Sequence, residues 1–132
     1  MPASARRVAG LMNGKIDLVF RVDGRFHVLD YKGNWLGERV SDYRGERLAE
    51  AMDHSQYRFQ ALLYALALDR YLQQRLGPAY SRERQLGECV YLFLRAAGLA
   101  PGAGVWRQRF GPALIEDAQA ALAGAWSAGV AA

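Results

Sequence analysis

The sequence predicts a single α/β domain built on a mixed β-sheet, and three observations support this prediction. Two runs of alternating residues, 15–22 and 25–32, flank the dipeptide Asp23-Gly24, which is the strongest short-range signal of a β-hairpin. The segment 57–76 is apolar around most of its first four turns, which is typical of a helix buried against a sheet. The apolar run 89–94 indicates a strand covered on both faces.

Shorter elements complete the expected order, β-β-α-α-β-β-α. A polar helix is expected over residues 41–52 with Ser41 as its N-cap, and Ser55 is placed to cap the long helix. Gly77-Pro78 should end that helix, because glycine commonly follows a helix and proline cannot continue it. The last two expected elements are a strand over residues 105–110 and a helix over residues 112–125.

Length and composition are those of one folded domain. The chain has 132 residues, of which 52% are hydrophobic, and its single cysteine, Cys89, excludes a disulfide framework and a cysteine-based zinc site. No apolar run approaches 18 residues, so we expect a cytoplasmic protein without contact to a membrane. The net charge of +4 permits a polyanionic partner but does not require one.

The expected hairpin brings two carboxylates together. With Asp23-Gly24 as the turn, the residue numbers of each cross-strand pair sum to 47, so Asp17 lies opposite Asp30. Lys32 projects on the same face, because side chains alternate along a strand. The other face is predicted to be core, and its residues are Ile16, Leu18, Phe20, Val22 and Leu29. The acidic face is expected to be only partly covered, by Val19, Phe26 and Val28.

Two facing carboxylates repel each other, so something must offset their charge. Lys32 supplies part of the compensation, and a divalent cation between Asp17 and Asp30 would supply the rest. Carboxylate oxygens suit Mg²⁺ or Mn²⁺, and the backbone carbonyl of Tyr31 could add a further ligand. The alternative is a solvated charged face, since Asp and Lys are common at exposed strand positions.

A second group of polar residues lies on the long helix. Tyr57, Gln60 and Tyr64 are spaced by three and four residues and therefore share one stripe. Aromatic residues at this spacing are usually core, but a buried glutamine amide needs hydrogen-bond partners. The stripe could therefore orient a lysine, a water molecule or a phosphate near the hairpin.

Four motifs within residues 11–110 carry a resemblance to a known family. They are Gly14-Lys-Ile-Asp-Leu-Val-Phe20, Leu29-Asp-Tyr-Lys-Gly-Asn-Trp-Leu-Gly37, Tyr57-Arg-Phe-Gln-Ala-Leu-Leu-Tyr64 and Val90-Tyr-Leu-Phe-Leu-Arg95. Together they resemble RecB-type nuclease domains of the PD-(D/E)xK, or restriction-endonuclease-like, superfamily. The family usually has serine at the position of Gly33, and it carries an upstream helical segment with an additional histidine and acidic ligand, which residues 1–14 do not match.

The resemblance implies a fold and a site. The fold is a restriction-endonuclease-like mixed sheet flanked by helices. The metal ligands are Asp17, Asp30 and the Tyr31 carbonyl, and the cofactor is Mg²⁺, for which Mn²⁺ can substitute. Lys32 is the active-site lysine. Gln60 and Tyr64 match the family's QxxxY helix motif, so the catalytic set is Asp17, Asp30, Lys32, Gln60 and Tyr64.

The resemblance also implies a function. We expect a Mg²⁺-dependent deoxyribonuclease of the exodeoxyribonuclease V type, which hydrolyses phosphodiester bonds within a RecBCD-type helicase–nuclease of DNA repair and recombination in the bacterial cytoplasm. Single-stranded DNA, RecC- and RecD-like subunits and RecA are the expected partners. Residues 1–132 are expected to form a nuclease-domain core without the upstream helical part, which alone cuts DNA poorly or not at all. The alternative is a catalytically incomplete DNA-binding or partner-docking module.

Overall fold

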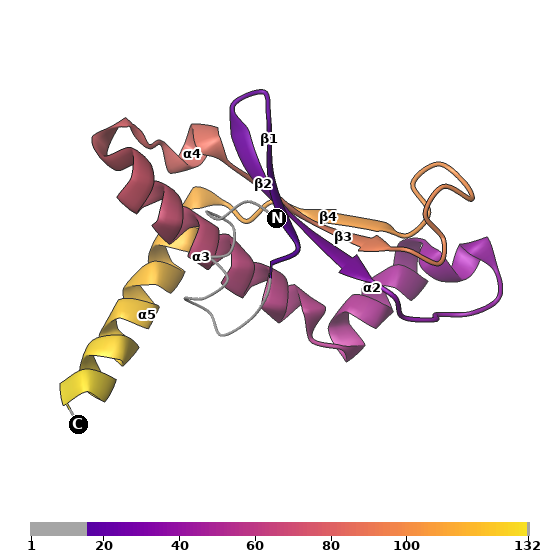
Figure 1. The fold of residues 1–132 in the computed structure, drawn as a ribbon. Coiled ribbons are helices and arrows are strands. Elements are labelled where there is room, and N and C mark those ends of the chain that lie inside the picture. The colour runs from indigo at the N-terminus through magenta and orange to yellow at the C-terminus, as the bar shows by residue number, and fades with distance from the viewer. Residues whose placement is uncertain (1–15, 132) are drawn as a thin grey trace.

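The structure is a four-stranded mixed sheet with helices packed against it (Figure 1). It is a computed structural model that describes residues 16–131, and the side chains of residues 16–124. In chain order its elements are β1 (Leu18–Val22), β2 (Arg25–Lys32), the 3₁₀ helix η1 (Val40–Tyr43), α2 (Gly45–His54), α3 (Tyr57–Leu76), the 3₁₀ helix η2 (Gly77–Ala79), α4 (Arg82–Gln85), β3 (Leu86–Phe93), β4 (Val105–Gln108) and α5 (Pro112–Ala131). Lys15, the first residue of the predicted strand 15–22, and the segment 1–14 lie outside the described residues.

The strands lie in the order β1-β2-β3-β4, which confirms the mixed sheet. β1 pairs with β2 and β3 with β4 in antiparallel fashion, whereas β2 and β3 are parallel. The predicted hairpin register is confirmed, because Leu18 pairs with Leu29 and Val22 with Arg25. Asp23 and Gly24 both have positive φ, at 50° and 80°, as a type I′ turn requires.

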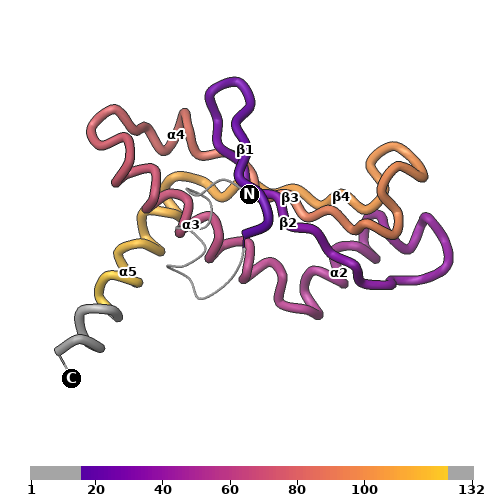
Figure 2. Tube along the Cα trace, viewed as in Figure 1, coloured from indigo at the N-terminus to yellow at the C-terminus, as the bar shows by residue number. Residues whose placement is uncertain are grey.

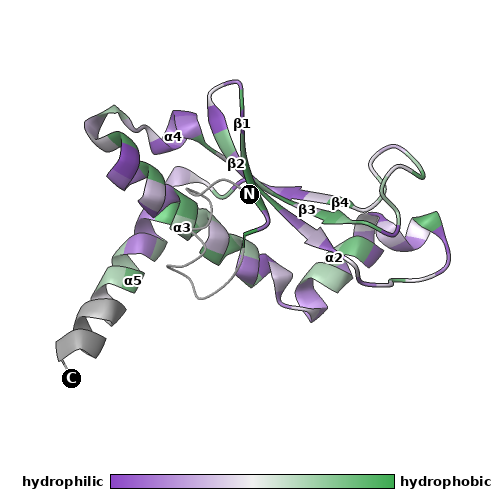
Figure 3. Ribbon diagram, in the orientation of Figure 1, coloured by the Kyte–Doolittle hydropathy of each residue, from purple (hydrophilic) through white to green (hydrophobic). Residues whose placement is uncertain are grey.

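The long helix α3 lies across one face of the sheet and contacts β2 and β3 (Figures 1 and 2). Its middle turns are apolar, as is most of the central strand β3 (Figure 3). Gly77 ends α3 as predicted: it has a φ of 59°, and its N–H donates to the Gln73 carbonyl. The terminal helix α5 packs on α3, so it forms an outer layer over that helix. Within residues 16–131, no helix is long and apolar enough to cross a membrane.

The predicted core face of the hairpin is wrong. Val28 is fully buried and Val19 and Phe26 pack against the core, so the face that carries Asp30 is the one under α3. Leu18, Phe20 and Leu29, predicted to be core, are only partly buried, and Val22 is exposed; Ile16, just before β1, is fully buried. Alternation correctly showed which residues share a face. It could not show which face α3 covers, because both faces carry several apolar residues.

The prediction that β3 is covered on both faces is also wrong. Cys89, Tyr91 and Phe93 are buried, whereas Val90 and Leu92 between them are only partly so. Because α3 packs on one face of the sheet, the strand alternates in burial although nearly all its residues are apolar.

The predicted helix starts are wrong for a local backbone reason. Ser41 lies inside η1, and the extended Arg44 and the positive φ of Gly45 separate η1 from α2. Ser55 is the C-cap of α2, and its N–H donates to the Ala51 carbonyl. Gln56 has a left-handed backbone, with φ of 57°, and directly precedes α3.

Three further boundaries differ from the prediction. The strand expected over residues 105–110 ends at Gln108, and the helix expected to end at residue 125 continues to Ala131. The short helix α4, just before β3, was not predicted. The order of the longer elements is nevertheless the predicted one.

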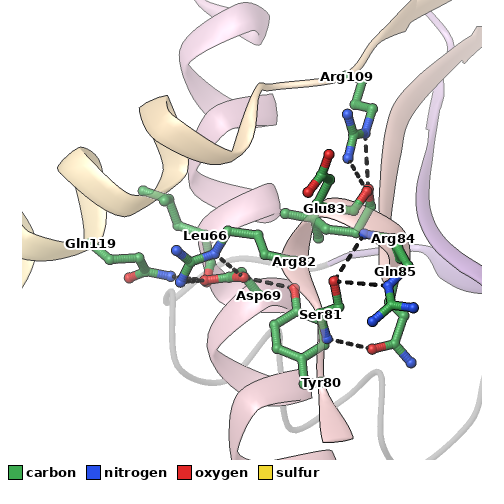
Figure 4. A network of polar contacts seen from close by, with 11 residues as sticks. Leu66, Asp69, Tyr80, Ser81, Arg82, Glu83, Arg84, Gln85, Arg109 and Gln119 are labelled. Carbon is green, nitrogen blue, oxygen red and sulfur yellow. Dashed lines mark hydrogen bonds and ion pairs between the residues drawn. The ribbon is translucent and has the colours of Figure 1, made fainter.

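A buried aspartate joins α3, α4 and α5 (Figure 4). Asp69 of α3 is fully buried and accepts two hydrogen bonds from Arg82, from Nε at 2.8 Å and Nη2 at 2.9 Å. The Tyr80 hydroxyl donates to it at 2.7 Å, and the Gln119 amide donates to it at 3.0 Å. The Asp69 charge is therefore compensated from three directions, as a buried carboxylate requires.

We expect Arg82→Ala to destabilise the fold by about 3–5 kcal/mol, because it leaves a buried charge without its cation. The matched control is Arg107→Ala. Arg107 also makes two hydrogen bonds to one carboxylate, that of Glu88, but its side chain is 63% exposed. The control should cost at most about 1 kcal/mol. Urea unfolding of the three proteins measures both values, and equal losses would contradict a structural role for the Asp69 network.

Candidate active site

The end of β2 carries the central pair of the site. Alternation along β2 places Asp30 and Lys32 on the face covered by α3. Asp30 is 3% exposed, and its Oδ2 lies 2.7 Å from the Lys32 ammonium nitrogen. An acidic and a basic group thus meet in a largely dry place, where their interaction is stronger than in water.

Three side chains hold the Lys32 ammonium in addition to Asp30. It donates a hydrogen bond to Gln60 Oε1 at 3.2 Å and lies 4.1 Å from the centre of the Tyr57 ring. The ring of Tyr91 lies 5.3 Å away, within the range of a cation–π contact. The Tyr91 hydroxyl donates to the same Gln60 oxygen at 2.6 Å. Two donors therefore fix the orientation of the Gln60 amide.

The Tyr57 ring is itself held in place from the loop after β2. Its hydroxyl exchanges hydrogen bonds with the Asn34 amide, at 3.0 Å and 3.2 Å. Asn34 follows Lys32 by two residues, so the loop and the lysine are fastened to the same tyrosine. These hydrogen bonds hold the Tyr57 ring in its position beside Lys32.

Asp17 lies immediately before β1 and next to the strand that carries Asp30. Its Oδ2 accepts a hydrogen bond from the Tyr31 N–H at 2.8 Å. Burial raises the pKa of the Asp30 carboxyl, Lys32 opposes this shift, and the nearby Asp17 carboxylate adds to it. The two carboxylates therefore interact, as the hairpin register predicts.

Tyr64 lies one turn after Gln60 and is buried. Burial, followed by the charges of Asp30 and Asp17, raises the pKa of its phenol to about 12, although a hydrogen bond with Gln60 acts in the opposite direction. Tyr64 is therefore a neutral phenol at physiological pH, and it can donate a hydrogen bond toward the acidic pair.

The donor set fits a hard divalent cation. Asp30 Oδ2 is buried and lies 2.7 Å from the Lys32 ammonium, and a carboxylate retains further lone pairs beside one such ion pair. Asp17 supplies a second carboxylate. Within the described residues, no group of three or more His, Cys, Asp or Glu side chains is placed to hold a metal ion. Carboxylate oxygens are the donors that Mg²⁺ prefers in proteins.

The structure places the side chains of the five predicted catalytic residues close together, and Tyr91 and Asn34 join their contacts. Lys32 contacts Asp30 and Gln60, and Asp17 and Tyr64 lie beside them. Sequence reasoning missed Tyr91 and Asn34. Tyr91 pairs with Asp30 in the parallel register of β2 and β3, which no local pattern reveals. Asn34 bonds Tyr57 across 23 residues of chain, and no local pattern reveals that contact either.

Comparison with known proteins assigns the chain to a family. Residues 3–130 match the model of the PD-(D/E)XK nuclease superfamily, so the chain belongs to that superfamily. The fold of a mixed sheet flanked by helices agrees with this assignment.

The chain is similar to part of the protein called RecBCD enzyme subunit RecB in several bacteria. It is 44% identical to the Escherichia coli protein over 115 residues, which are 86% of this chain and 10% of that protein. It is 43% identical to the Haemophilus influenzae protein over 111 residues, which are 84% of this chain and 9% of that protein. The Mycobacterium tuberculosis protein is 49% identical over 87 residues, 65% of this chain and 8% of that protein. The chain thus spans about a tenth of the length of these curated relatives.

Replacing Asp30 by asparagine should stabilise the metal-free protein at neutral pH. The folded-state pKa of Asp30 is raised above its ordinary 3.8, so folding disfavours the ionised form. The wild type therefore loses stability as the pH rises from about 3.8 through the raised value. Asp30→Asn does not carry this cost, so its advantage should be largest at pH 7 and vanish at low pH.

Urea unfolding with EDTA, across this pH range, measures the difference. Asp117→Asn is the matched control, because Asp117 is exposed on α5 and should show no such advantage. An Asp30→Asn protein that is less stable than the wild type at pH 7 would show that the ion pair with Lys32 outweighs the burial of the charge.

Proposed function

We propose that this chain is the nuclease part of a RecBCD-type enzyme and hydrolyses phosphodiester bonds of DNA with a divalent cation. The observation that carries the proposal is the buried Asp30 carboxylate, whose Oδ2 lies 2.7 Å from the Lys32 ammonium and whose pKa is raised by burial and by the neighbouring Asp17. The sequence Asp30-Tyr31-Lys32 also spells the (D/E)XK element in the name of the superfamily.

In this proposal Asp17, Asp30 and the Tyr31 carbonyl hold Mg²⁺, for which Mn²⁺ can substitute. When bound, such a cation lowers the pKa of a coordinated water and neutralises charge on the phosphate. The Tyr31 N–H supports this arrangement by orienting the Asp17 carboxylate. Both carboxylates are hard oxygen donors, which suits these ions better than softer metals.

Lys32 is the proposed catalytic cation. Its ammonium is fixed by Asp30, Gln60 and the Tyr57 ring, so little side-chain freedom remains to be lost when a phosphate arrives. From that position it stabilises negative charge that develops on the phosphate, or orients the attacking water. Gln60 holds the lysine directly, and the neutral Tyr64 phenol supports Gln60 and the acidic pair.

The proposed substrate is single-stranded DNA, and the proposed partners are RecC- and RecD-like subunits and RecA. The relatives are named as subunits of the RecBCD enzyme, which supports an assembly of this kind. The fifteen arginines of the chain supply a sequence-independent attraction for phosphate. We also assign the chain to the bacterial cytoplasm on the strength of these relatives.

One observation favours a second candidate function. Among residues 16–131, only two carboxylates face the proposed cation, and no third His, Cys, Asp or Glu joins them. With these two carboxylates in the described part of the chain, the site could bind DNA or a partner subunit without cutting. The second candidate is therefore a catalytically incomplete binding or docking module.

Lys32→Ala should lower the cleavage rate about 100-fold or more while DNA binding changes little, because the lysine acts on the reacting phosphate. Lys32→Arg should fail as well, since a planar, delocalised guanidinium does not replace the compact ammonium charge that Asp30 and Gln60 hold in position. Cleavage of a labelled single-stranded oligonucleotide with Mg²⁺ or Mn²⁺ measures the rate, and a filter-binding assay in EDTA measures affinity.

Arg75→Ala is the matched control, because Arg75 is an exposed cation at the far end of α3. It should cut normally. Near-normal cleavage by Lys32→Ala would show that the lysine has no catalytic role. A wild-type chain that binds DNA but never cuts, at any metal concentration, would favour the docking module.

A further inference from the structure

A cleft of about 330 Å³ lies beyond the carboxyl ends of the two parallel strands. The loop that follows β2 forms one side of it through Trp35 and Arg39, and the segment that follows β3 forms the other side through Arg95. Ligands of open α/β sheets commonly bind at this edge, where parallel strands end together. This cleft is separate from the contacts that hold Lys32.

Two hydrogen bonds tie the cleft to the candidate active site. The Leu94 N–H donates to the Lys32 carbonyl at 2.9 Å, and Arg95 Nε donates to the Gly33 carbonyl at 2.8 Å. Trp35 follows Lys32 by three residues, which span at most about 10 Å. The cleft therefore lies within a few nucleotides of the position at which a phosphate would meet Lys32.

The loop that carries Trp35 is rigid, although Trp35 itself projects from it. The buried Tyr43 hydroxyl accepts from the Leu36 N–H at 3.1 Å and donates to the Gly37 carbonyl at 3.3 Å. A side chain at Gly37 would collide with Asp42, so the chain approaches that carboxylate closely. Trp35 is nevertheless 62% exposed. A rigid backbone that holds an indole ring in solvent is suited to stacking.

The charge around the cleft is mainly positive. Arg39 and Arg95 are exposed at its two sides, and Glu38 is its single acidic lining residue. Arg44 stands close by and donates to the Pro101 carbonyl at 2.9 Å. An aromatic platform flanked by arginines is how proteins hold unpaired bases and their phosphates, since a base inside a duplex cannot reach such a ring.

We propose that this cleft binds one unpaired base of single-stranded DNA, stacked on Trp35, with the flanking phosphates held by Arg39 and Arg95. This inference rests on the proposed function, because it states that the DNA reaching the Lys32 site is single-stranded. The loop after β2, which carries Trp35, would then be the part of the protein that selects single-stranded DNA.

Tryptophan fluorescence in EDTA tests the inference without any cleavage. Oligo(dT) should quench the emission of the wild type, and a blunt duplex of mixed sequence should not. Trp35→Ala should remove the quenching and lower the affinity for oligo(dT) about tenfold, in line with the loss of one stacked base. Arg39→Ala and Arg95→Ala should each reduce the slope of log affinity against log salt by roughly 0.7.

The controls are matched in exposure. Phe59 on α3 is 60% exposed and does not line the cleft, so Phe59→Ala should bind oligo(dT) normally. Arg70→Ala, an exposed arginine of α3, should keep the wild-type salt slope. Equal affinity of Trp35→Ala and the wild type, or equal quenching by the duplex, would overturn the inference.

The two proposals fail in different ways. Quenching without cleavage in Mg²⁺ would reject the nuclease activity and leave the base-binding cleft intact. Cleavage that depends on Lys32 without quenching at Trp35 would reject the cleft and leave the activity intact.

Discussion

The carboxylate of Asp30 is buried under α3 beside a single ammonium group, and the candidate site is arranged around that charge. Lys32 cannot move away without leaving Asp30 uncompensated, so the lysine is held against the sheet. Gln60 and the Tyr57 ring then fill the remaining positions around the ammonium. The parallel pairing of β2 with β3 brings Tyr91 alongside, where its hydroxyl fixes Gln60.

The structure contains a second buried carboxylate, and the contrast between the two is informative. Asp69 receives hydrogen bonds from an arginine, a tyrosine and a glutamine, so its charge is fully compensated. Asp30 has one cation, Lys32, and a neighbouring carboxylate, Asp17, which raises its pKa. The first arrangement stabilises the fold. The second leaves a carboxyl group with a perturbed pKa beside a cation, which is common at functional sites.

Local sequence patterns predicted the hairpin register, the end of α3 and the order of the main elements, because each depends on neighbouring residues. The local patterns gave wrong or no predictions for features that depend on contacts between segments distant in the sequence. The covered face of the hairpin depends on where α3 packs, and both faces carry several apolar residues. The contact of Tyr91 with Gln60 depends on a parallel pairing across the α2–α3 connection. Gln56 has a left-handed backbone conformation that glycine usually adopts, and no sequence motif predicts this conformation for a glutamine.

In the proposed site, Asp17 and Asp30 together hold a divalent cation beside Lys32. Anomalous diffraction from crystals grown with Mn²⁺ is a direct test, because manganese can be located without reference to activity. We expect one anomalous peak about 2.1 Å from an oxygen of each carboxylate, a distance typical of small divalent cations. Crystals of Asp30→Asn should lose the peak. A peak elsewhere, or none at saturating Mn²⁺, would show that these carboxylates do not form the metal site.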